Sequence, residues 1–102
     1  MKELKEIIRD IREKLEDAEK YAQEAVKHKE QYKSLADTYA QIAQDDMRQA
    51  DMLHRHATDM IETKERSGVE APASMRAIWE YEHEQEVDKA MDVRRLLDMY
   101  KG

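Results

Sequence analysis

Four polar residues interrupt apolar stripes that otherwise recur at helical spacing: Asp46, His54, His83 and Glu86. A buried carboxylate without a partner costs free energy, so each carboxylate should meet a counter-charge, a hydrogen-bond donor or a metal ion. Inward carboxylates and histidines from facing helices are the ligands of helical-bundle metal sites. A histidine on an apolar stripe is more often a core or interface residue. These four residues therefore define a metal site as an alternative to a purely structural role.

Local spacing permits the same chemistry. In three places two ligand types stand about one helical turn apart: Glu80-x-x-His83, Asp51-x-x-His54 and His83-x-x-Glu86. Charged residues make up 41% of the chain, so such pairs also arise by chance. Spacing alone does not separate a metal site from a charged helix surface.

A run of acids near the C-terminus suggests a second kind of site. Five acids fall within nine residues, from Glu80 to Asp88, and the whole chain carries a net charge of −6. A solvated helix face is one interpretation, and a docking surface for a basic partner is the other. We assign partner binding to the acids of this run that are not metal candidates: Glu80, Glu82, Glu84 and Asp88. The negative charge disfavours direct nucleic-acid binding, because phosphate contacts need a basic face.

Several reaction classes lack their sequence signatures. Cysteine is absent, which excludes thiol nucleophiles and thiolate metal sites, and the chain has only two glycines, too few for a phosphate-binding loop. The serines stand in no nucleophile motif. The N-terminal segment is amphipathic and lacks the apolar stretch of a signal peptide. We expect a cytoplasmic protein without enzymatic activity, cofactor or membrane contact.

Helical spacing dominates the rest of the chain. Neither glycine nor proline occurs before Gly68, and Pro72 is the only proline. The clearest stripe alternates steps of four and three and predicts one buried helix face: Leu4, Ile8, Ile11, Leu15, Ala18, Ala22 and Ala25. The segment after it carries two adjacent stripes, one of large and one of small residues, which predicts that more than one side is covered.

The stripe fails at Lys29, and a break there divides the chain into helices of similar length. We predict a single all-α domain over residues 1–102, with helices at about 2–28, 32–66 and 73–101 and a loop at 67–72. Such helices pack as an antiparallel, up-down-up three-helix bundle. Three helices leave wide apolar faces, so we expect a homodimer to complete the bundle, with a subunit contact formed by Leu53, Met60 and Leu97.

The segment from Tyr21 to His54 resembles the first two helices of ferritin-like proteins of the rubrerythrin type. The resemblance is carried by a pattern of tyrosine, alanine and acid: Tyr32, Ala36, Tyr39, Ile42-Ala43, Asp45-Asp46, Ala50 and Leu53. It implies a ferritin-like bundle. Where that family carries its Glu-x-x-His iron ligands, this chain reads Asp46-Met47-Arg48-Gln49. We therefore expect that tight transition-metal binding is absent.

The sequence thus favours a non-catalytic helical protein that acts through protein–protein contacts with a basic partner. One version of this hypothesis is a small acidic protein of a phage or mobile element that blocks a nucleic-acid enzyme by occupying its basic groove. The alternative is a ferritin-like metal-binding bundle that uses its inward carboxylates and histidines.

Overall fold

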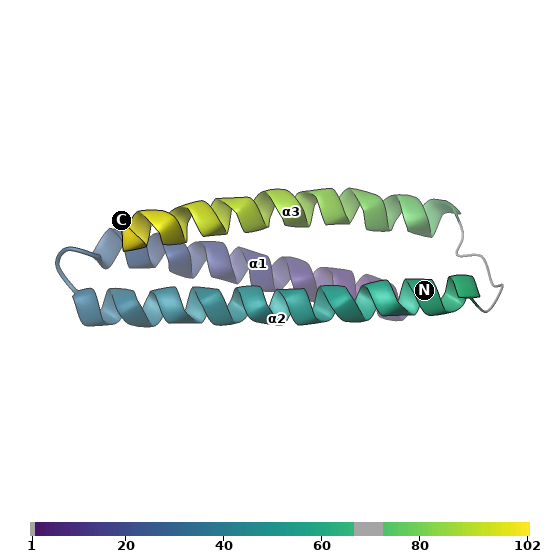
Figure 1. Ribbon diagram of the computed structural model, residues 1–102, viewed down its shortest axis with the longest axis horizontal. Helices are drawn as coiled ribbons and strands as arrows, with labels where there is room; N and C mark the ends of the chain where they lie inside the picture. Colours follow the sequence, from purple (N-terminus) through teal and green to yellow (C-terminus); the bar gives the residue numbers. More distant parts are fainter. Residues whose placement is uncertain (1, 67–72) are drawn as a thin grey trace.

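The computed structural model describes residues 2–66 and 73–102, which form three α-helices packed lengthwise (Figure 1). α1 spans Lys2–His28, α2 spans Lys33–Arg66 and α3 spans Ala73–Lys101. The helices form an elongated bundle of 56 × 19 × 17 Å. The predicted all-α class and helix packing are confirmed. The predicted loop at 67–72 lies outside the described residues.

The first helix, α1, holds the bundle together. All seven members of its apolar stripe are buried, from Leu4 to Ala25. α1 packs along both α2 and α3, whereas α2 and α3 make few contacts with each other. The stripe is therefore shared between two neighbours, and the other two helices are joined mainly through it.

Side-chain size changes along the core. At one end Leu4 and Ile8 pack around Ala57, with Trp79 of α3 partly buried against them. At the other end the buried residues are mostly alanines, with Val93 and Leu97 of α3. The large α2 stripe residues Leu53 and Met60 are only partly buried, and it is the small-residue stripe of α2 that faces the core: Ala36, Ala40, Ala43, Ala50 and Ala57.

The position of Leu97 corrects one expectation. We predicted that it would lie across a contact between subunits, but it is only 8% exposed and belongs to the alanine-rich end of the core within one chain. The small side chains of Ala18 and Ala22 leave room for a bulky residue from α3, and Leu97 occupies that room.

Pairs of side chains between helices fix their relative register. Between α1 and α2, Lys14 lies near Asp46, and the rings of Tyr21 and Tyr39 stack with their centroids 5.8 Å apart. Between α1 and α3, three polar pairs have the same difference of 70 in residue number: Arg12 with Glu82, Glu19 with Lys89, and Lys29 with the Met99 carbonyl. α3 therefore keeps a constant register along α1.

The turn between α1 and α2 forms without glycine or proline. The amide of Tyr32 donates to the His28 carbonyl at 2.9 Å, and the Tyr32 carbonyl accepts from the Ala36 amide at 2.9 Å. Lys29, where the apolar stripe fails, donates from Nζ to the Met99 carbonyl at 3.1 Å. A lysine at the end of a helix can satisfy terminal carbonyls and complement the negative end of the helix dipole. Lys29 thus ties the turn to the last turns of α3.

Candidate functional site

A groove runs between α2 and α3, where these helices make little contact. Its volume is about 220 Å³, and side chains from all three helices line it. Ile11 and Leu15 of α1 contribute to its apolar lining, together with Met47 of α2 and Val87 of α3. Its polar lining combines acids, histidines and one arginine: Asp51, His54, His83, Glu86 and Arg94. The groove therefore offers both an apolar contact surface and titratable groups.

Two histidines meet across this groove. His54 Nε2 of α2 and His83 Nδ1 of α3 lie 3.0 Å apart, a hydrogen-bond distance at which one ring donates and the other accepts. Trp79 stacks on the His54 ring with centroids 5.3 Å apart. Burial lowers the pKa of His54, the neighbouring His83 lowers it further, and Asp51 opposes both effects. The neutral form of the His54 imidazole is therefore favoured.

Glu86 lies beside the two histidines and is the most unusual charged residue of the site. It is only 8% exposed, and its Oε1 atom is buried with no hydrogen-bond partner within the described part of the chain. Burial raises the pKa of Glu86 to about 7, with a further upward contribution from Glu82 and a downward one from Arg12. One ligand atom from each of His54, His83 and Glu86 lies within 4.8 Å of the other two.

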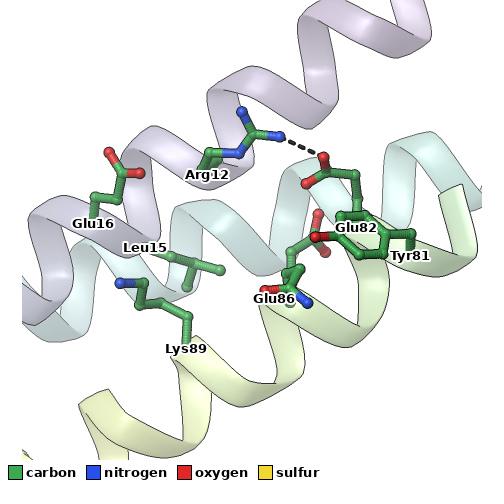
Figure 2. Close-up of a pocket in the computed structure, with 8 residues that line it drawn as sticks. Arg12, Leu15, Glu16, Tyr81, Glu82, Glu86 and Lys89 are labelled. Carbon is green, nitrogen blue, oxygen red and sulfur yellow. Dashed lines mark hydrogen bonds and ion pairs between the residues drawn. The ribbon is translucent and has the colours of Figure 1, made fainter. Parts of the chain in front are cut away.

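Glu86 also lines a second hollow, of about 270 Å³, between α1 and α3. Figure 2 shows Arg12 of α1 pointing toward Glu82 of α3 at this hollow, where the two side chains form an ion pair and hydrogen bond. The Glu82 side chain is only 15% exposed, whereas half of the Arg12 side chain is exposed. Glu82 therefore forms its ion pair with Arg12 of the same chain, which leaves its carboxylate less accessible to a partner protein.

The other acids of the predicted docking run have a different environment. Glu80, Glu84 and Asp88 are exposed on α3. Of the four residues that we assigned to partner binding, the structure thus leaves three on the surface and places Glu82 against α1. The run is an acidic face of three exposed carboxylates beside the groove residue Val87.

Asp46, the fourth metal candidate, lies apart from the cluster. Lys14 Nζ of α1 is 3.9 Å from its Oδ1, and its Oδ2 is buried with no hydrogen bond to any described residue. Burial raises the pKa of Asp46, Lys14 opposes that effect, and Asp17 and Asp45 add to it. Since His54 follows two helical turns further along α2, Asp46 cannot share a metal ion with it. The structure unites three of the four predicted residues.

Sequence reasoning missed the roles of Trp79 and Lys29. Trp79 packs on both histidine rings, with a centroid distance of 6.3 Å to His83. Its position one turn before His83 was a usable signal, because residues four apart share a helix face. The hydrogen bond from Lys29 to Met99 had no such signal, since it depends on how α1 and α3 align.

Comparison with known proteins finds no matching family model, no matching curated protein and no matching solved structure. Over residues 2–66 and 73–102, the structure has no helix that is both long and apolar enough to cross a bilayer.

Proposed function

We propose that this chain is a non-catalytic binding protein and that the groove between α2 and α3 accepts a helix from a protein partner with a basic surface. The observation that carries the proposal is the scarcity of contacts between α2 and α3, which leaves a groove with an apolar floor beside the His54–His83 contact. Helices that dock in grooves do so through apolar residues about one turn apart. Val87 and Ala90 on one wall, and Met47 and Ala50 on the other, give such residues an apolar lining to pack against.

We propose that the three helices have the up-down-up arrangement of a four-helix bundle from which the fourth helix is missing, and that this bundle is ferritin-like in character. α1 would occupy one corner, with α2 and α3 at the two adjacent corners, so that the fourth corner is the groove. This arrangement accounts for the extensive packing of α1 on both neighbours and for the few contacts between α2 and α3. Between α1 and α2 the paired residues rise in number on one helix and fall on the other, from Lys14 with Asp46 to Tyr21 with Tyr39, which supports antiparallel directions. Between α1 and α3 the residue numbers of the pairs rise together, which supports parallel directions.

The negative charge of this chain indicates which kind of protein partner would fit the groove. The exposed acids Glu80, Glu84 and Asp88 flank Val87 in the sequence of α3, and the whole chain has a net charge of −6. Complementary charge speeds association and selects orientation more than it adds affinity. A partner helix with one apolar face and flanking lysines or arginines fits both features. The basic groove of a nucleic-acid enzyme, blocked by this acidic protein, is one partner surface of this type.

Charge reversal tests the proposal. In Glu80→Lys/Glu84→Lys, both changes are on exposed positions, so helix content and melting temperature should stay near those of the wild type. Association with the partner, isolated from the native host, should slow about tenfold or more at low salt and lose much of its salt dependence. The control Glu6→Lys/Glu13→Lys makes the same charge change on exposed positions of α1. Equal binding by the two double variants would refute an acidic docking face.

A further inference from the structure

Three side chains of the groove, His54, His83 and Glu86, place one potential metal-ligand atom each close to the other two. His54 comes from α2, whereas His83 and Glu86 come from α3, one turn apart. Their ligand atoms lie within 4.8 Å of one another, and Glu86 brings a carboxylate that is more than nine-tenths buried and has an oxygen without a hydrogen bond to any residue in 2–66 or 73–102. A cation at this point would supply the partner that the carboxylate lacks.

The separation of the two imidazole nitrogens fits a shared metal. Two nitrogen ligands at about 2.0–2.1 Å from one ion, at angles between octahedral and tetrahedral, are separated by about 2.8–3.4 Å. His54 Nε2 and His83 Nδ1 are 3.0 Å apart. Both nitrogens can therefore reach one ion once the donor ring of their hydrogen bond carries its proton on the other nitrogen or loses it, and the Glu86 carboxylate has to approach by roughly 1.5 Å to complete the set.

We propose that His54, His83 and Glu86 bind one divalent transition-metal ion, with zinc as the expected metal, and that this ion joins α2 to α3 across the groove. Two imidazoles and one carboxylate suit zinc and iron far better than magnesium or calcium, which prefer ligand sets made only of oxygen. Because His83 is exposed, a fourth ligand position remains within reach of water. This ligand set differs from the Glu-x-x-His positions of ferritin-like proteins, where the chain has Asp46 and Gln49. This proposed site departs from our sequence-based expectation that tight transition-metal binding is absent, because the structure brings together three ligands that the sequence did not group by themselves.

Titration of tag-free protein, first stripped with a chelator, tests the site without reference to any protein partner. Isothermal calorimetry should give one Zn²⁺ per chain. At a free Zn²⁺ concentration of 100 times Kd, the melting temperature should rise by about 10 °C. Mg²⁺ should produce neither heat nor a shift. Co²⁺ in place of Zn²⁺ should give the visible absorption of a nitrogen- and oxygen-ligated ion.

Matched variants assign the ligands. His83→Ala and Glu86→Gln should each weaken Zn²⁺ binding at least about tenfold, while circular dichroism shows that both remain helical. His56→Ala removes an exposed histidine two positions from His54 and should bind Zn²⁺ like the wild type. Wild-type protein that takes up neither Zn²⁺ nor Fe²⁺ would overturn the proposal, and so would unchanged affinity in His83→Ala. Full affinity in Glu86→Gln would overturn the three-ligand assignment, and preference for Fe²⁺ would overturn the choice of zinc.

Discussion

Two buried carboxylates in one small bundle have different surroundings. Glu86 faces the two histidines of the groove and also lines the hollow beside Arg12. Asp46 has Lys14 3.9 Å away and further acids nearby. Each has a buried oxygen without a hydrogen bond inside the described ranges, so each lowers the stability of the fold when it is charged. In an otherwise apolar core, such residues are retained at a cost in stability, which is typical of functional positions.

Asp46→Asn should stabilise the protein at neutral pH. Burial raises the pKa of Asp46 in the fold, so its charged form is less favourable there than in the unfolded chain. The folded state consequently loses stability as pH rises from the ordinary aspartate value of 3.8 through the raised pKa, and the loss is absent below 3.8. Urea unfolding should show a gain from Asp46→Asn at pH 7 that disappears near pH 3.

The exposed Asp59 of α2 supplies the control for this effect. Asp59→Asn should change the free energy of unfolding little at either pH. A loss of stability in Asp46→Asn at pH 7 would mean that the attraction to Lys14 outweighs the cost of burial.

Sequence spacing identified the four polar residues on the apolar stripes but did not show which of them meet. His83 and Glu86 share a helix face, so their proximity follows from the chain alone. The approach of His54 to His83 depends on the relative position of α2 and α3, which no local pattern records. For the same reason Asp46, on the same helix as His54, was grouped with the cluster although it contacts α1.

The helices themselves were the most predictable feature. The stripe from Leu4 to Ala25 is buried in full, because its spacing follows the helix period and α1 has a neighbour on two sides. The choice between the two stripes of α2 could not be made from hydrophobicity, since the alanines are buried whereas the larger residues Tyr39 and Leu53 are only partly buried against the core. The burial of the alanines depends on how closely α1 and α2 approach each other, which is a tertiary property.

Because α1 contacts both other helices, its stripe should dominate stability. Ile11→Ala removes a side chain that is 1% exposed, and it should lower the free energy of unfolding by about 2–5 kcal/mol. Ile78→Ala on α3, where the residue is 43% exposed, should lower it by less than about 1 kcal/mol. Chemical denaturation measures both. Similar losses in the two variants would contradict a central role for α1.

At the scale of the whole molecule, a narrow bundle exposes much apolar surface. Several large apolar side chains are at least two-fifths exposed: Tyr32, Leu35, Met52, Ile78, Tyr81, Val87, Met91 and Met99. Exposed apolar surface of this kind often marks contacts with other proteins. The elongated shape spreads these residues over α2 and α3 and over the turn before α2.

We predict a homodimer on this basis, although Leu97 is not available for its interface. Light scattering at micromolar concentrations should return twice the chain mass of 12.1 kDa. Dilution should shift the measured mass toward the monomer. A mass of 12.1 kDa at every concentration would contradict the homodimer.

Site-specific cross-linking tests the central claim, that the groove between α2 and α3 binds a partner helix, most directly. A photoreactive residue would replace Val87, which lines the groove and is 44% exposed, or Glu13, which is exposed on α1 as a control. After irradiation in the native host, the groove position should cross-link to a basic helix of another protein, and Glu80→Lys/Glu84→Lys should abolish the product. Equal products from the two positions, or a groove product that survives charge reversal, would contradict the account.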